Sequence, residues 1–395
     1  MKLPKEWEFR KLGTVVSKQK YAMVDGPFGS NLKSEHYKTS GIPVLQSGFV
    51  TSGKFFAKSY VYVDKELFDQ QRRSAAKGGD LLMAKIGAQA GKCAIIPLDH
   101  PESIIAGNCL KLSFDEEQNS TEFFNMVLAY NYDKNGLCEI KTETAQPAIS
   151  LKSLKDYKVP VPPLSEQKKI AKILSTWDQA ISATEKLLEN SQQQKKALMQ
   201  ELLTGKKRLL DENGVEFSGE WKFLTFDELF IVANKKSAQV KSSDYLLSGS
   251  IPIVDQSQKI IAGYCDSKEV YSDTPVIVFG DHTRCIKWVD FSFCPGADGT
   301  QVLDVKKGVD KKLAYYVLLN TPIPNLGYSR HMRELKEKDF KIPLDLKEQI
   351  KISKFLSLVD QEIETLQKKL DCLQQEKKAL MQQLLTGKKR VKVAA

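Results

Sequence analysis

The feature that most constrains this chain is a long segment that occurs twice. Residues 164–208 and 346–390 align without a gap, and their last parts read KKALMQELLTGKKR and KKALMQQLLTGKKR. Each copy follows a larger and more variable segment. A repeat this close indicates that the chain is built from two halves.

Both copies are predicted to be helices. Their apolar residues recur in alternating steps of four and three, which is the heptad seam of a coiled coil. Gly205 and Gly387 stand where a helix end favours a residue that can take positive φ. Each helix is expected to span roughly 38 residues, or about 57 Å. The predicted seam residues are Ile170, Leu174, Trp177, Ile181, Leu188, Leu198 and Leu202 in the first copy, and Ile352, Leu356, Val359, Ile363, Leu366, Leu370, Leu373, Leu380 and Leu384 in the second.

Four polar residues interrupt the predicted seam: Thr184, Ser191, Lys195 and Lys377. Polar seam residues lower stability but can fix register and partner. The helices either dimerise something else or pair with each other, antiparallel, inside one chain. We favour the second interpretation, because each helix follows a segment that also repeats. It predicts two halves related by a pseudo-twofold axis.

The two variable segments share a plan but not their loops. In the first, strand patterns at 42–45, 60–63, 80–86, 93–96 and 109–113 and a helix at 122–130 predict an α+β domain with a curved, mostly antiparallel sheet. The second segment echoes these parts at 251–254, 275–280, 314–319 and 337–343. The two long helices are nearly identical, whereas the loops of the two variable segments differ. This contrast suggests that the helices bind one partner twice, while each domain binds something different.

Composition sets broad limits on function. The chain has 395 residues, with 59 Lys and Arg against 49 Asp and Glu, a net charge of +10. That excess fits a nucleic-acid partner and also fits a generic basic protein. No signal-peptide core or membrane span is predicted, and the seven scattered cysteines suggest reduced thiols in the cytoplasm. The nearest metal-like grouping, His282 with Cys285 and Cys294, lacks a fourth ligand.

Searches for catalytic motifs favour a chain that is not an enzyme. There is no amino-methyltransferase motif and no Gly-rich cofactor loop, and Thr204–Lys207 lacks the upstream Gly of a P-loop. Glu139-Ile140-Lys141 and Glu334-Leu335-Lys336 match the tail of a metal-dependent nuclease signature, but such triplets are frequent by chance. We therefore expect no cofactor and no metal in this chain.

The architecture resembles the DNA-specificity subunit of type I restriction–modification systems. The motifs that carry the resemblance are the exits KDYKVPVPPLSEQKKIAKIL and KDFKIPLDLKEQIKISKFL, the two helix ends, and EWEFRKLG, DGPFGSNLK, GIPVLQSG and GDLLMAKIGAQAGKCAII in the first half. The second variable segment keeps only the outline. The resemblance implies two mixed α/β target-recognition domains (1–157 and 220–341) separated by two long antiparallel coiled-coil helices (within 158–208 and 342–395), with a connector at 209–219.

The resemblance also implies a function. Each recognition domain would read one part of a bipartite, asymmetric site on double-stranded DNA, and the helices would set the spacer. Two methyltransferase subunits would dock on the helices and methylate adenine N6 with S-adenosylmethionine. Up to two translocase–nuclease subunits would add cleavage that depends on ATP and Mg²⁺. This chain would supply the DNA sequence specificity and no catalytic activity.

Sequence reading needs donors and acceptors aimed at base edges, with cations on the phosphates. The loops around Gln89, 282–284 and 329–333 are the strongest candidates, because polar groups cluster there beside apolar strands. The candidates in the first domain are Ser30, Asn31, Lys33, Gln46, Arg72, Arg73, Lys85, Gln89, Lys92 and Gln146. Those in the second are Lys235, Lys236, Gln256, Gln258, Lys259, His282, Arg284, Ser329, Arg330, His331 and Arg333.

Two other classes of function stay open at this point. A coiled-coil scaffold with two protein-binding domains would show no DNA sequence preference and weak salt dependence, whereas contacts to several phosphates weaken steeply with salt. An enzyme that modifies or cuts DNA alone would turn over with S-adenosylmethionine or magnesium without partners.

Overall fold

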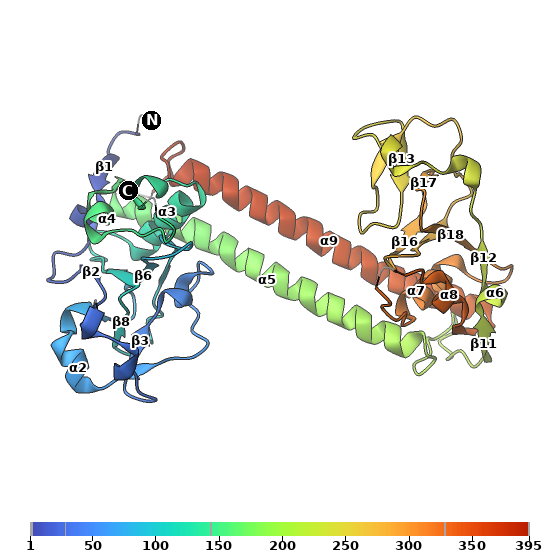
Figure 1. The fold of residues 1–395 in the computed structure, drawn as a ribbon, viewed down its shortest axis with the longest axis horizontal. Coiled ribbons are helices and arrows are strands. Elements are labelled where there is room, and N and C mark those ends of the chain that lie inside the picture. The colour runs from blue at the N-terminus through green and yellow to red at the C-terminus, as the bar shows by residue number, and fades with distance from the viewer. Residues whose placement is uncertain (1–2, 28, 143, 328, 394–395) are drawn as a thin grey trace. The chain divides into compact units, whose positions relative to one another are not determined.

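The computed structural model describes residues 3–27, 29–142, 144–327 and 329–393, without the side chain of Ser30. The chain folds into two compact units (Figure 1). Unit 1 comprises Met1–Ala183 and Leu370–Ala395, and unit 2 comprises Thr184–Lys369. Each unit therefore contains one variable segment and a part of both long helices.

The two predicted long helices are confirmed. Helix α5 (Leu164–Leu202) and helix α9 (Leu346–Leu384) have 39 residues each and run side by side in opposite directions (Figure 1). Gly205 and Gly387 follow them with φ of 71° and 73°, as expected for helix ends. The predicted seam residues are buried or half-buried, while most residues between them are exposed. The helices pair within one chain.

Polar residues in the seam are matched across the helix pair. Lys377 Nζ lies 2.6 Å from an Asp178 carboxylate oxygen in unit 1, and Lys195 Nζ lies 2.5 Å from Asp360 in unit 2. The two pairs occupy equivalent positions of the repeat. A slip of one heptad would place each lysine against other partners, so these pairs favour one register. Thr184 and Ser191 are buried in the same seam.

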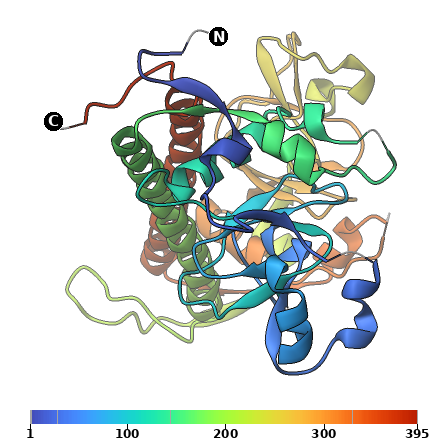
Figure 2. The same cartoon turned by 90° about the vertical axis from the view of Figure 1, so that its left-hand side faces the viewer.

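An arginine after each long helix ties it to the start of the other one. In unit 2, Arg208 donates to both carboxylate oxygens of Glu348, at 2.5 and 2.7 Å. In unit 1, the equivalent Arg390 donates to Glu166 and to Glu6, the latter at 3.0 Å. The N-terminal and C-terminal segments thus lie on the same side of unit 1 (Figure 2).

The described residues of unit 1 form three sheets rather than the single curved sheet expected. One has the antiparallel order β2-β9-β6-β7; another, β4-β3-β8-β5, has a parallel β3–β8 pair; a third pairs β1 with β10. Gly26 lies where two sheets meet, and a side chain there would overlap the Ala106 carbonyl. The strands are Glu8–Lys11 (β1), Met23–Asp25 (β2), Ile42–Leu45 (β3), Tyr62–Val63 (β4), Ala75–Ala76 (β5), Leu81–Ala84 (β6), Cys93–Ile95 (β7), Ser103–Ile105 (β8), Cys109–Leu112 (β9) and Lys158–Val161 (β10).

Unit 2 repeats this plan, with the antiparallel order β12-β18-β15-β16, a three-stranded sheet β14-β13-β17 and the pair β11–β19. The predicted domain boundary at 341 falls within β19, and the boundary at 157 directly precedes β10. The strands are Trp221–Thr225 (β11), Phe230–Val232 (β12), Ile251–Val254 (β13), Gly263–Cys265 (β14), Val276–Gly280 (β15), Ile286–Val289 (β16), Cys294–Pro295 (β17), Thr300–Val305 (β18) and Asp339–Pro343 (β19).

Helices close each core. Ser120 caps α3 by accepting from Phe123 N, and Asp310 caps α7 in the same way, which explains where both helices begin. The C-terminal part of α9 packs its Leu384 into the core of unit 1, and that of α5 packs Leu202 into the core of unit 2. The helices other than α5 and α9 are Leu12–Val15 (α1), Lys65–Gln70 (α2), Thr121–Asp133 (α3), Leu151–Asp156 (α4), Phe226–Leu229 (α6), Lys311–Asn320 (α7) and Met332–Lys336 (α8).

Candidate nucleic-acid interface

In unit 1 a β-hairpin tip packs on a loop that comes much later in the chain. The tip, residues 85–92, joins β6 to β7. Gly87 N donates to Pro147 O at 2.8 Å, and Ile149 N donates to Lys85 O at 2.9 Å. These bonds bring the loops of Gln89 and Gln146 together, so two of the predicted DNA contacts lie on neighbouring loops.

An aromatic ring organises the polar side chains of this surface. Tyr132, near the end of α3, donates to Gln89 Oε1 at 3.3 Å. The ammonium groups of Lys141 and Lys92 lie 4.8 and 5.6 Å from the ring centre. Burial, together with the nearby Asp133, raises the pKa of Tyr132, so this hydroxyl stays protonated as a donor. The result is a cluster of two cations, an amide and an aromatic ring, the groups that DNA readout uses.

One predicted contact in unit 1, Lys85, is buried, whereas Arg73, which shares Asp25 with it, is exposed. Lys85 is buried and donates to Asp25 at 3.1 Å, while the other Asp25 oxygen accepts from Arg73 at 2.7 Å. The nearby Lys92 donates to Thr51 O at 2.7 Å and so holds the loop before β4 against the hairpin. The Lys85 ammonium group is thus buried against the Asp25 carboxylate.

Unit 2 has the same arrangement with different side chains. Its hairpin tip, residues 281–285 between β15 and β16, packs on the loop before α8. His331 N donates to Asp281 O at 2.8 Å, which is equivalent to the Ile149–Lys85 bond of unit 1. His282 Nδ1 lies 3.3 Å from Ser329 O, and Arg284 donates to Ile323 O at 3.0 Å. The predicted loops 282–284 and 329–333 therefore lie together.

His331 has a structural position rather than the DNA contact expected of it. Its side chain has 0% exposure. Its Nδ1 lies 2.9 Å from Asp281 O, and its Nε2 accepts from Leu326 N at 3.3 Å. A ring that donates at Nδ1 and accepts at Nε2 is neutral. It joins the hairpin tip to the loop that carries Ser329.

A third loop completes the unit 2 surface. The buried Lys287 donates to the carbonyls of Asp255 and Lys259, at 2.6 and 2.5 Å. Burial lowers the pKa of Lys287, partly opposed by Cys285 and Asp255. Gln256 Oε1 also accepts from His282 N at 3.1 Å. The predicted residues Gln256, Gln258 and Lys259 are thereby held beside the hairpin tip.

Of the remaining predicted DNA contacts, Arg330 and Arg333 lie within the 329–333 segment of unit 2, and the others lie elsewhere on the two units. Gln46 is half-buried at the end of β3, and Ser30 has a side chain outside the described residues. Lys33 pairs with Glu35, Arg72 with Asp69, and Arg333 with Glu337. The remaining exposed candidates are Asn31, Lys235, Lys236 and Arg330. All of these stay predictions.

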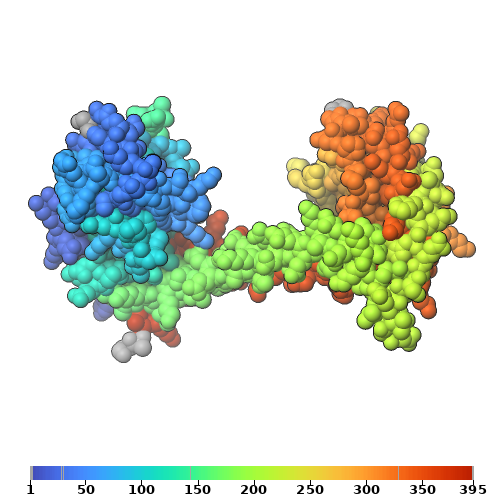
Figure 3. Space-filling view, turned by 90° about the horizontal axis from the view of Figure 1, so that it is seen from below, coloured from blue at the N-terminus to red at the C-terminus, as the bar shows by residue number. Residues whose placement is uncertain are grey.

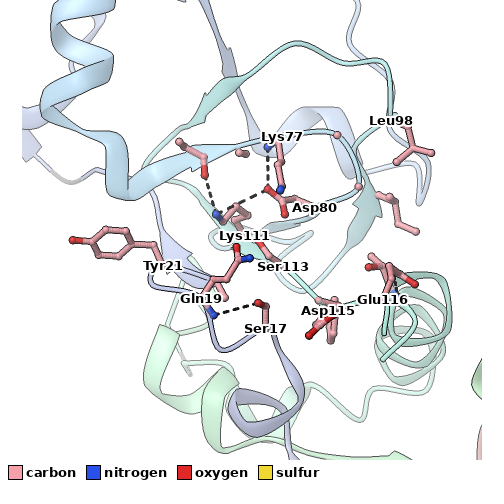
Figure 4. A pocket seen from close by; sticks show the side chains of 18 of the residues that line it. Ser17, Gln19, Tyr21, Lys77, Asp80, Leu98, Lys111, Ser113, Asp115 and Glu116 are labelled. Atoms are coloured by element: carbon pink, nitrogen blue, oxygen red, sulfur yellow. Dashed lines mark hydrogen bonds and ion pairs between the residues drawn. The ribbon is translucent and has the colours of Figure 1, made fainter. Parts of the chain in front are cut away.

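A cavity of about 1050 Å³ opens in unit 1 (Figure 4). It is lined by both signs of charge, including Lys77, Asp80 and Lys111. Lys111 donates to Ala75 O at 2.9 Å and lies 4.0 Å from Asp80. The Lys111 ammonium group thus has partners within the protein, and the cavity wall carries both cationic and acidic side chains.

Sequence reasoning missed Tyr132, Lys141, Asp25 and Lys287. Their roles come from contacts in space rather than from a sequence motif; Tyr132, Asp25 and Lys287 contact residues that are 43, 60 and 32 positions away. Among the described residues no group of three or more His, Cys, Asp or Glu side chains is placed to hold a metal ion, and no helix is long and apolar enough to span a membrane. Cys294 of the weak metal-like grouping is buried in a sheet.

Comparison with known proteins agrees with this two-unit plan. A model of the type I restriction modification DNA specificity domain matches residues 4–191 and again residues 218–375. The chain belongs to this DNA-specificity family. The finding supports the specificity interpretation over a coiled-coil scaffold, and the family's defining domain occurs once in each half.

Known specificity subunits match this chain, one of them over nearly its whole length and another over about a third of it. The putative type I restriction enzyme MjaX specificity subunit of Methanocaldococcus jannaschii is 26% identical over 421 residues, covering 99% of this chain and 95% of the relative. The EcoR124I/EcoR124II specificity subunit of Escherichia coli is 32% identical over 133 residues, covering 32% of this chain and 31% of the relative.

Solved structures show the same fold. The S subunit of a type I restriction–modification system from M. genitalium aligns with TM-score 0.62 at 17% identity, over 98% of both chains. The HsdS subunit from Thermoanaerobacter tengcongensis aligns with TM-score 0.51 at 17% identity, also over 98% of both chains.

Proposed function

We propose that each unit of this specificity subunit reads one part of a bipartite DNA site. The observation that carries the proposal is the equivalent pair of loop clusters. In both units a hairpin tip packs on the loop before a short helix, and the side chains presented differ. Equivalent frames with different donors and acceptors suit two different half-sites.

The helix pair would set the unspecified spacer between the two parts. The seam pairs and end clamps hold α5 and α9 in one register, as a ruler requires. Half-sites on one face of B-DNA lie about 34–36 Å apart, within the length of helices of about 57 Å. We propose residues 1–157 and 220–341 as the recognition domains and 158–208 and 342–395 as the spacer regions.

The partner subunits would dock where the repeat is preserved. Figure 3 shows a face of α5 that the described residues of the chain leave open. We propose two methyltransferase subunits, which would use S-adenosylmethionine to methylate adenine N6, and up to two translocase–nuclease subunits, which would use ATP and Mg²⁺. This chain would bind none of these cofactors and would act in the cytoplasm.

A map of methylated adenines in the source cell, with and without this gene, tests the proposal. We expect one gapped, bipartite motif to vanish on deletion and to return with the intact gene. Gln89→Ala should then relax one part of the motif, and Arg330→Ala only the other part. An unchanged map in a cell whose methyltransferase partner is active would contradict the proposal, as would relaxation of both parts by either single variant.

A further inference from the structure

Each unit exposes an apolar side chain on the loop that follows β3 in unit 1 and β13 in unit 2. In unit 1 the loop joins β3 to β4, and Phe56 is 69% exposed. In unit 2 the loop joins β13 to β14, and Ile260 is 47% exposed. The neighbouring Phe55 and Ile261 are half-buried. Both loops therefore turn one apolar residue inward and present the adjacent one to solvent.

The loop of unit 1 is firmly held. Phe56 N donates to Phe49 O at 2.8 Å. The Phe49 ring lies edge-on to Phe55 and Tyr60, with ring centres 6.0 and 5.3 Å apart. The exposure of Phe56 thus comes from a braced loop with an aromatic base.

The loop of unit 2 is held by different contacts to the same effect. Lys287 donates to Lys259 O, the residue before Ile260, at 2.5 Å. Ala262 N donates to Ile253 O at 2.9 Å on the other side of the tip. The two loops are held by different contacts, yet both expose an apolar residue at the tip.

Both tips adjoin the loop clusters of the candidate DNA interface. Lys92 binds the unit 1 loop through Thr51 O, and Thr283 Oγ1 binds the unit 2 loop through Gln256 O at 2.5 Å. The tips also carry cations. Lys54 and Lys58 flank Phe56, and Lys259 precedes Ile260; all three are exposed.

We propose that Phe56 and Ile260 are wedges that insert at a base step within each half-site. Lysines on either side would bind phosphates, and the apolar side chain would enter between bases that it partly unstacks, as apolar wedges of other DNA-binding proteins do. Unstacking would add indirect readout, since pyrimidine–purine steps open at lower cost than others. The inference rests on the proposed DNA function.

The test uses the full chain in complex with its methyltransferase partner. The probe is a duplex that carries the mapped methylation motif, with 2-aminopurine placed at each position in turn. The intact complex should raise 2-aminopurine fluorescence at one step in each half-site. Phe56→Ala should abolish the rise in one half and Ile260→Ala in the other, each weakening binding about 5- to 100-fold, the range of single stacking contacts. Phe56→Leu should retain most of the signal.

Phe9→Ala is the matched control, because Phe9 is also an exposed aromatic residue of unit 1, 51% exposed, but lies on β1. It should leave the signal unchanged. Fluorescence unaffected by Phe56→Ala, or no rise with the intact complex on DNA that it binds specifically, would overturn the wedge. So would loss of the methyltransferase partner from the Phe56→Ala complex, which would make this loop a protein-docking site. If the intact complex shows no sequence preference at all, the proposed function itself has failed.

Discussion

Replacing Arg208 with methionine should locally unfold the end of unit 2. The Glu348 side chain has 0% exposure, and its carboxylate makes two hydrogen bonds to Arg208. Methionine keeps the apolar length beside Trp221 but removes the cation. Leaving a buried carboxylate unpaired costs about 3–5 kcal/mol. The N-terminus of α9, which begins at Leu346, offsets up to about 1 kcal/mol of this.

Hydrogen exchange measured by mass spectrometry can test this net loss of about 2–4 kcal/mol. At about 1.4 kcal/mol per tenfold change, amides of β11 and β19 should exchange about 30- to 700-fold faster where opening is in rapid equilibrium. The double variant Arg208→Met with Glu348→Leu should recover most of the protection, because both charges are then gone.

Arg390→Met is the matched control for this prediction. Arg390 is equivalent in the repeat, but its partner Glu166 also accepts from Trp7 Nε1 at 3.3 Å, so the loss should be smaller and confined to unit 1, near β1 and β10. The reasoning would be refuted if the double variant of unit 2 exchanged as fast as the single one. The arginine would then stabilise the fold through Gly219 O or Trp221, and charge pairing would not be the cause.

Three further predictions concern the helices and a recognition loop. Residues 177–183 and 372–378 lie opposite each other in the helix pair, and seven helical residues span about 10 Å. Removing both segments should therefore shorten the spacer of the methylation motif by about three base pairs, and removing only one should abolish assembly. An unchanged motif would contradict the proposal that the helices set the spacer. Lys377→Leu should destabilise unit 1 in thermal melts by up to about 1 kcal/mol, because its partner Asp178 is 43% exposed, and adding Asp178→Leu should restore stability, whereas additive losses would exclude pairing as the cause. Gly280→Ala should displace the hairpin tip, where a Cβ would overlap a threonine hydroxyl, and should relax only one part of the motif; a motif with both parts intact would show that the tip is not read.

The sequence was sufficient for the helices because their signal is local. Heptad steps of the kind seen at Ile170 and Leu174 predict a buried stripe from spacing alone. The polar positions Lys195 and Lys377 were also visible, but not the aspartates that pair with them. Antiparallel pairing brings residues together across most of the chain, and no local pattern encodes that choice.

The recognition surface was predictable only in part. The polar loops at Gln89 and at 282–284 were found because they interrupt apolar strands. The burial of Lys85 and His331 was not predicted, because their partners Asp25 and Asp281 lie 60 and 50 residues away in the chain. A polar side chain at a loop has the same sequence signature whether it reads DNA or supports the residue that does.

The structure bears on why the two helix ends are nearly identical in sequence. Because the pairing is antiparallel, the end of α5 packs with Phe226 in unit 2, and the end of α9 packs with Trp7 in unit 1. Each unit thus joins the beginning of one repeat to the end of the other. A substitution in one helix end changes the core of one unit only. A partner that binds both units would then meet two different surfaces. Packing alone would tolerate compensated differences between the ends, as it does between the two cores. Near identity at exposed positions such as Lys206 and Lys388 therefore argues for one partner bound twice.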